Sequence, residues 1–173
     1  TRFTGFAEVQ TPVSLEAGSQ LVFESDYNGW GSNGSGDITF LGSTELASSE
    51  EPVVSFGGDV SFGPDACLRA LLRSPGEPAI QVAGNFHADG EYAPSGLNAI
   101  SFSADSPGIT EISLVVAESI TGTFDLTNLV PGQRFGERTR FVELDHRPTE
   151  IVFVFETFAP GDLNADGAID LAD

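Results

Sequence analysis

The chain has 173 residues, enough for one domain with a real core, and it carries a formal charge of −19. All seven basic residues are arginines, which excludes Schiff-base and general-base chemistry on lysine as well as Lys–Asn isopeptide cross-links. The negative charge argues against nucleic acid and anionic lipid as partners, and no apolar run approaches the ~20 residues that would insert into a membrane as a helix.

Short β-prone runs dominate the chain, and turn-forming residues separate them. The 20 glycines and 10 prolines fall mostly between the apolar runs. Many short strands with turn signals between them are typical of an antiparallel β-sandwich or jelly roll, and 14 phenylalanines supply large rings to fill its interior. About ten strands are expected, at residues 2–9, 20–25, 37–46, 52–57, 79–86, 97–104, 110–119, 120–127, 138–144 and 149–158.

The segment 25–37, SDYNGWGSNGSGD, contains Tyr27 and the single tryptophan, Trp30, among glycine, asparagine and serine residues. Aromatic faces can stack on sugar rings, and amides and hydroxyls can bind sugar hydroxyl groups. Tyr27 and Trp30 are therefore candidate carbohydrate-binding residues. The alternative is a long hairpin loop whose tryptophan folds back over the core.

The sequence GPDACLRALLRS contains the one helix that the pattern predicts, near residues 64–73. Pro64 suits the first helical position, and Asp65 suits the positive end of the helix dipole. Leu68, Leu71 and Leu72 have the i, i+3, i+4 spacing of an apolar stripe. We expect this helix to close one open end of the sandwich.

Two histidines, His87 and His146, each have carboxylates nearby in the sequence. A shared metal or acid–base site would require the two to meet in space, and in a chain with 26 acidic residues a carboxylate beside a histidine is expected by chance. The nucleophile elbow, the zinc-protease motif and the phosphate-binding loop are all missing from the sequence. We therefore expect a protein that is not an enzyme, with a glycosidase or lyase kept as an alternative.

Two of the expected strands carry informative patterns. In EISLVVAE, Ile112, Leu114 and Val116 alternate with other residues and should share one face. The run EIVFVFE at 150–156 is apolar on both faces, which predicts a central strand covered on both sides.

The chain ends on GDLNADGAIDLAD, whose acidic residues recur with the spacing of an EF-hand calcium loop. Calcium takes six to eight oxygen ligands, and a twelve-residue loop supplies them from fixed positions around a central glycine, here Gly167. Ile169 would lie beneath the loop as an apolar plug. The predicted ligands are Asp162, Asn164, Asp166, Ala168 through its carbonyl, Asp170 and Asp173.

This segment, residues 161–173, resembles the first calcium-binding repeat of a type I dockerin, with its pattern D-x-N-x-D-G-x-I-D-x-x-D. The resemblance implies calcium as a cofactor and a secreted, extracellular or cell-surface protein. Dockerins bind cohesin modules through two such repeats. The second repeat is absent from the sequence, which argues against cohesin binding by this chain.

We therefore expect an all-β fold: an antiparallel β-sandwich of jelly-roll or Ig-like type at residues 1–159, with one short helix. A partial dockerin-type calcium-binding segment follows at residues 160–173. The expected function is that of a non-catalytic extracellular structural protein, a surface, matrix or filament subunit that associates with copies of itself. The alternative is a carbohydrate-binding module of a secreted polysaccharide-degrading system, with glycans as partners.

Overall fold

The structure is a computed structural model, and it describes residues 1–5, 7–9, 13–29, 31–46, 53–70, 72, 75–94, 107–135 and 138–162. In these residues the chain forms strands and turns without a helix, so the predicted all-β class is confirmed. None of them forms a helix that could cross a membrane. The expected strand at 97–104 lies outside the described residues.

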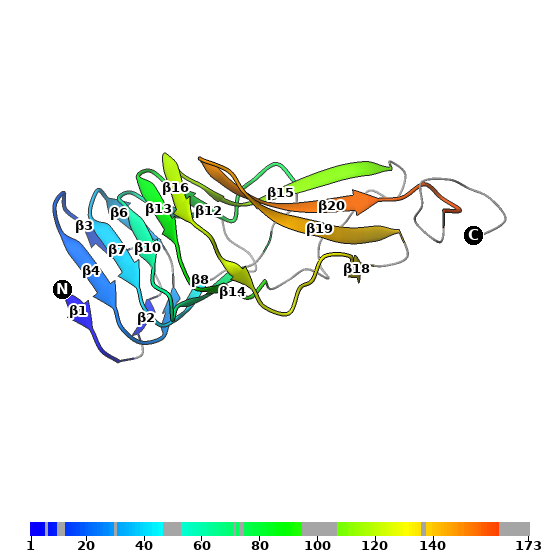
Figure 1. The fold of residues 1–173 in the computed structure, drawn as a ribbon. Helices are drawn as coiled ribbons and strands as arrows, with labels where there is room; N and C mark the ends of the chain where they lie inside the picture. The colour runs from blue at the N-terminus through cyan, green and yellow to red at the C-terminus, as the bar shows by residue number, and fades with distance from the viewer. Residues whose placement is uncertain are drawn as a thin grey trace.

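Successive strands pass in turn to three sheets, so three consecutive strands make one coil of a solenoid (Figure 1). Sheet A has the order β1 (Arg2–Phe3), β4 (Gln20–Phe23), β7 (Asp37–Phe40), β10 (Val60–Phe62), β13 (Asn85–Ala88) and β16 (Ser119–Gly122). Sheet B has the order β2 (Ala7–Val9), β5 (Tyr27–Gly29), β8 (Ser43–Leu46), β11 (Cys67–Ala70), β14 (Glu91–Tyr92) and β17 (Asp125–Leu126).

Sheet C begins in the same way and then changes character. Its order is β3 (Val13–Leu15), β6 (Ser32–Gly34), β9 (Val54–Phe56), β12 (Ile80–Val82), β15 (Gly108–Val116), β20 (Glu150–Thr157), β19 (Thr139–His146) and β18 (Arg134–Phe135). Pairing is parallel up to β15 and antiparallel from β15 to β18. The long strands β15, β19 and β20 extend from the end of the molecule opposite to β1 (Figure 1).

The expected jelly-roll or Ig-like type is therefore not confirmed. In the solenoid each strand pairs in parallel with the strand three places later in the chain, as β4 does with β7, whereas a jelly roll is built from antiparallel pairs. Parallel neighbours need a long connection between them, and here the other two strands of the coil provide it.

The expected helix near residues 64–73 is not confirmed either, because β11 runs through its centre. This strand pairs in parallel with β8 on one side and β14 on the other. Leu68 and Ala70 are buried while Arg69 between them is exposed, which is the alternation of a strand. Hydrogen bonding on both sides outweighs the helical spacing of the leucines.

Stacked aromatic rings fill the interior of the solenoid. Phe23, Phe40 and Phe62 come from neighbouring strands of sheet A, and the Phe40 ring centroid lies 5.5 Å from that of Phe23 and 5.0 Å from that of Phe62. Phe3 on β1 begins this column, 5.4 Å from Phe23. The interior is therefore a column in which each coil packs on the previous one.

A ladder of polar side chains links the coils at one corner of the solenoid. Asp37 Oδ1 accepts a hydrogen bond from the amide of Asp59, and Asp59 Oδ1 accepts one from the amide of Asn85. Ser119 Oγ then donates to Asn85 Oδ1 at 2.6 Å. Each coil thus provides an acceptor for the next one, which satisfies amides at a turn of the chain.

The predicted central strand at 150–156 is confirmed as β20, which lies between β15 and β19 and is buried on both faces. The alternation expected in β15 is only partly correct. Ile112 and Leu114 are fully buried, but a register shift between Ser113 and Val115 turns Val115 inward and leaves Val116 half-buried. A bulge of this kind changes which face the following residues occupy.

Candidate functional site

The predicted calcium loop is described only at its first residue. Asp162 is 3% exposed, and its amide donates to the carbonyl of Ala159 at 3.2 Å. The other predicted ligands, Asn164, Asp166, Ala168, Asp170 and Asp173, lie outside the described residues. Within the part of the chain that is described, no group of three or more metal-ligating side chains is found. The calcium loop and the boundary near residue 160 stay predictions.

Tyr27, a candidate for sugar stacking, lies in the core and not at the surface. Its side chain is 2% exposed, and its ring centroid lies 4.5 Å from that of Phe23 and 5.1 Å from that of Phe40. Burial raises the pKa of its hydroxyl to about 12. In this conformation the ring has no face open to a sugar. Trp30 lies outside the described residues.

The two histidines lie on different sheets and have different partners. His87 on β13 is exposed, and its Nδ1 lies 3.0 Å from the hydroxyl of Thr121. His146 ends β19 and is half-buried, with Nε2 accepting a hydrogen bond from the backbone amide of Phe124 at 3.1 Å. Burial lowers the pKa of His146, while a hydrogen bond with the backbone of Leu144 and the charge of Asp145 act in the opposite direction. Each histidine has a structural contact, and the two form no common site.

One surface feature lies at the N-terminal end of the solenoid. β1, β2 and β3 are the first strands of sheets A, B and C, and each pairs on one side only within the described residues. The space between them is a hollow of 540 Å³, which we call the N-terminal opening. Thr1 and Glu8 lie at it, and its apolar lining consists of Phe3, Ala7, Val13, Leu15, Leu21 and Phe23.

The other end of the solenoid is closed. The ring of Phe124, which is 4% exposed, lies 5.5 Å from Phe62 and 5.9 Å from Phe86. Tyr92 then contacts Phe153 of β20 at 5.5 Å, so the aromatic column continues into the antiparallel part of sheet C. The fold therefore has a covered end and, in the described chain, an uncovered one.

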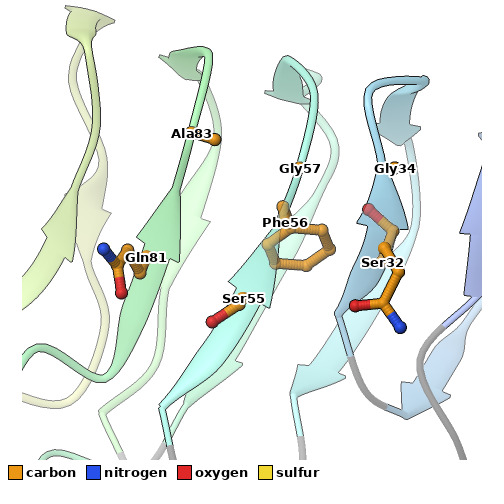
Figure 2. A pocket seen from close by; sticks show the side chains of 8 residues that line it. Ser32, Gly34, Ser55, Phe56, Gly57, Gln81 and Ala83 are labelled. Carbon is orange, nitrogen blue, oxygen red and sulfur yellow. The ribbon is translucent and has the colours of Figure 1, made fainter. Parts of the chain in front are cut away.

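A second feature is a hollow of 270 Å³ along three neighbouring strands, β6, β9 and β12. We call it the sheet C groove. Residues that line it include Asn33, and Ser32, Ser55, Gly57, Gln81 and Ala83, which Figure 2 labels. The residues on its walls carry no formal charge, on a chain whose net charge is −19.

Neither hollow is predicted by the amino-acid pattern. Ser32, Asn33 and Gly34 belong to the segment 25–37 that the sequence singled out, but Ser55 and Gln81 come from later coils. Parallel pairing of β9 with β12 sets Ser55 beside Gln81. Each of the strands β6, β9 and β12 has a polar residue at its middle position. This pattern points to a common polar surface only when the order of the strands in the sheet is known.

Comparison with known proteins identifies no relative: family models, curated proteins and solved structures all give no match to this chain.

Proposed function

We propose that the chain is a non-catalytic extracellular structural protein, a surface, matrix or filament subunit that associates with copies of itself. The N-terminal opening is the observation that carries this proposal. Solenoid proteins keep their terminal coils soluble by covering them with a polar cap. Among the residues that the structure describes, the apolar interior of the first coil faces outward at that end.

Exposure of the first coil gives association a driving force. The Phe3 side chain is 44% exposed, whereas the Phe23 side chain on the next strand is 3% exposed. Burying a phenylalanine side chain contributes about 1.5–3 kcal/mol. Within the described residues, β1, β2 and β3 each have one unpaired edge with backbone donors and acceptors, and such edges readily pair with another chain.

The charges at this end favour a second copy as the occupant. Arg2 on β1 pairs with Glu24 at 2.9 Å, and Glu8 lines the opening. Both signs are thus present at the rim, whereas the whole chain is strongly acidic. Two identical ends related by a two-fold axis can set opposite charges against each other with little repulsion.

The dockerin-like tail supports the extracellular location. β20, which leads to the tail, extends from the end of the molecule opposite to β1 (Figure 1). Association through the N-terminal opening therefore leaves Asp162, the first predicted calcium ligand, at the far end of each copy. Calcium binding and self-association are separate properties in this proposal.

Sedimentation velocity at several protein concentrations tests the proposal, in calcium and again in excess chelator. We expect association in both conditions. Phe3→Glu places a charge in the opening and should give a monomer. Val130→Glu is the matched control, because Val130 is 63% exposed and lies outside the lining of the opening.

A monomer at every concentration overturns the proposal. If Phe3→Glu and Val130→Glu associate equally, the N-terminal opening is not the contact between copies. Association that disappears in chelator assigns the contact to calcium and not to the opening.

A further inference from the structure

The sheet C groove crosses the middle of a sheet, and this position restricts what it can bind. β6, β9 and β12 each have a hydrogen-bonded neighbour on both sides, since β3 lies beyond β6 and β15 lies beyond β12. The strands therefore have no free edge at which a peptide could add as a further strand. A ligand in the groove must be held by side chains and by the turns at the strand ends.

The side chains at the groove are neutral and carry both donors and acceptors. Asn33, Ser55 and Gln81 are exposed, and they lie on three neighbouring strands of sheet C. Figure 2 shows Ser55 and Gln81 on two of these strands. Amide side chains present a carbonyl oxygen and two N–H groups, and a hydroxyl both donates and accepts. Ser55 lies beside Gln81 on the neighbouring strand, and because Ser32 pairs with Phe56, Asn33 lies two residues further along the strand direction.

Glycines leave the main chain open along the groove. A Cβ atom on Gly57 would lie 1.7 Å from the carbonyl oxygen of Gly34, and one on Gly31 would lie 1.7 Å from that of Ser55. Side chains are therefore excluded there by close contact of the coils. The result is a shallow site whose walls include backbone, small side chains and the side chains of Asn33 and Gln81.

Charge decides between classes of ligand. A net charge of −19 disfavours phosphate and carboxylate ligands, and the groove contains no arginine to offset it. A cation would need carboxylates, and none lines the groove. We propose that the sheet C groove binds a short segment of a neutral saccharide, with Asn33, Ser55 and Gln81 bonding its hydroxyl groups. This site is independent of self-association through the N-terminal opening.

Titration calorimetry with three neutral oligosaccharides, cellohexaose, xylohexaose and mannohexaose, tests the site on the full chain. We expect one or more of them to bind. The Asn33→Ala/Gln81→Ala double variant should weaken that binding by at least about tenfold, because it removes two hydrogen-bonding groups. Gln81→Ala alone should weaken it by a smaller factor and serves if the double variant fails to fold.

Gln20→Ala is the matched control, since Gln20 is an exposed glutamine on a strand of sheet A. Its affinity should equal that of the unchanged chain. Hexagalacturonate, an acidic oligosaccharide, and a neutral unstructured peptide should bind more weakly than the neutral sugars. The proposal is overturned if no neutral sugar binds, or if Gln20→Ala and Gln81→Ala lose affinity equally. Stronger binding of the acidic sugar or of the peptide overturns it as well.

Discussion

His146 Nε2 accepts a hydrogen bond from the backbone amide of Phe124, with 3.1 Å between the two nitrogens. The bond joins the end of β19 to the segment that follows β16, where the Phe124 ring enters the aromatic column. It therefore ties the antiparallel part of sheet C to the last coil of the solenoid. His146 can accept this hydrogen bond only when its imidazole is neutral, because both nitrogens of the protonated ring are donors.

We predict that His146→Ala lowers the free energy of unfolding by about 1–3 kcal/mol, because the part-buried amide of Phe124 loses its partner. Urea unfolding followed by circular dichroism measures this change. His87→Ala is the control, since His87 is exposed and bonds a surface hydroxyl. It should cost less than about 0.5 kcal/mol. Equal losses in the two variants would contradict a specific role for His146.

The His146 contribution should also depend on pH. Burial lowers the pKa of the folded-state imidazole below its ordinary value of about 6.5. On acidification the unfolded chain therefore takes up this proton first, which favours unfolding. The contribution is fully present above about pH 6.5 and is lost as the pH falls through the lower, folded-state pKa.

The difference in unfolding free energy between the unchanged chain and His146→Ala isolates this effect, because other titrating groups are common to both. We expect the difference to be constant above about pH 6.5 and to shrink as the pH falls below that value. A difference that grows on acidification would show that His146 is stabilised in its charged form.

The amino-acid pattern was sufficient for the all-β class and for the central strand β20. A run that is apolar on both faces, such as 150–156, has one stable place in a sheet, which is between two neighbours. The same reasoning was wrong about β11, where two periodicities overlap. Leu68, Leu71 and Leu72 fit a helical stripe, but Ala66, Leu68 and Ala70 also alternate and are buried.

The solenoid itself could not be predicted, because the spacing between coils varies. Val22 pairs with Thr39 and Ile38 with Val60, but Val60 pairs with Phe86 and Phe86 with Ile120. Loops of different length enter the coils, so no fixed sequence repeat marks them. Short alternating strands look alike whether they pair with the next strand or with the third one along the chain.

The candidate sites could be predicted only in part, for a related reason. The segment 25–37 was singled out for its aromatic and polar residues, and it does supply Ser32 and Asn33 to the sheet C groove. Tyr27 in the same segment faces the core. Which side of a short strand faces outward depends on its register in the sheet, and a segment of mixed polar and aromatic residues does not fix that register.

Phe40 should be among the most sensitive positions of the fold. Its side chain is fully buried, and its ring contacts those of Phe23, Tyr27 and Phe62. We predict that Phe40→Ala lowers the free energy of unfolding by about 3–5 kcal/mol, since it leaves a cavity inside the column. Val130→Ala, at a side chain that is 63% exposed, should change it by less than about 0.5 kcal/mol. Urea unfolding followed by near-ultraviolet circular dichroism measures both, and a mild loss for Phe40→Ala would mean that the coils do not stack through these rings.

Asp162 allows the predicted calcium loop to be tested through the stability of the whole domain. Because this first ligand position is 3% exposed and lies close after β20, which ends at Thr157, calcium bound there should be released when the domain unfolds. A ligand that binds only the folded state stabilises it by about 2.7 kcal/mol when its concentration is a hundred times its dissociation constant. We therefore expect calcium to raise the melting temperature of the unchanged chain and to have little effect on Asp162→Ala.

Calcium can also stabilise so acidic a chain by screening its charge, and the control must separate the two effects. Asp125→Ala removes the same charge from an exposed position on β17 and leaves the predicted loop intact. Its melting temperature should rise with calcium as much as that of the unchanged chain. Comparing each variant with itself in chelator removes any loss of stability that the substitution causes on its own. If Asp162→Ala keeps the full calcium-dependent rise, then calcium acts on the acidic surface as a whole, and residue 162 does not begin a binding loop.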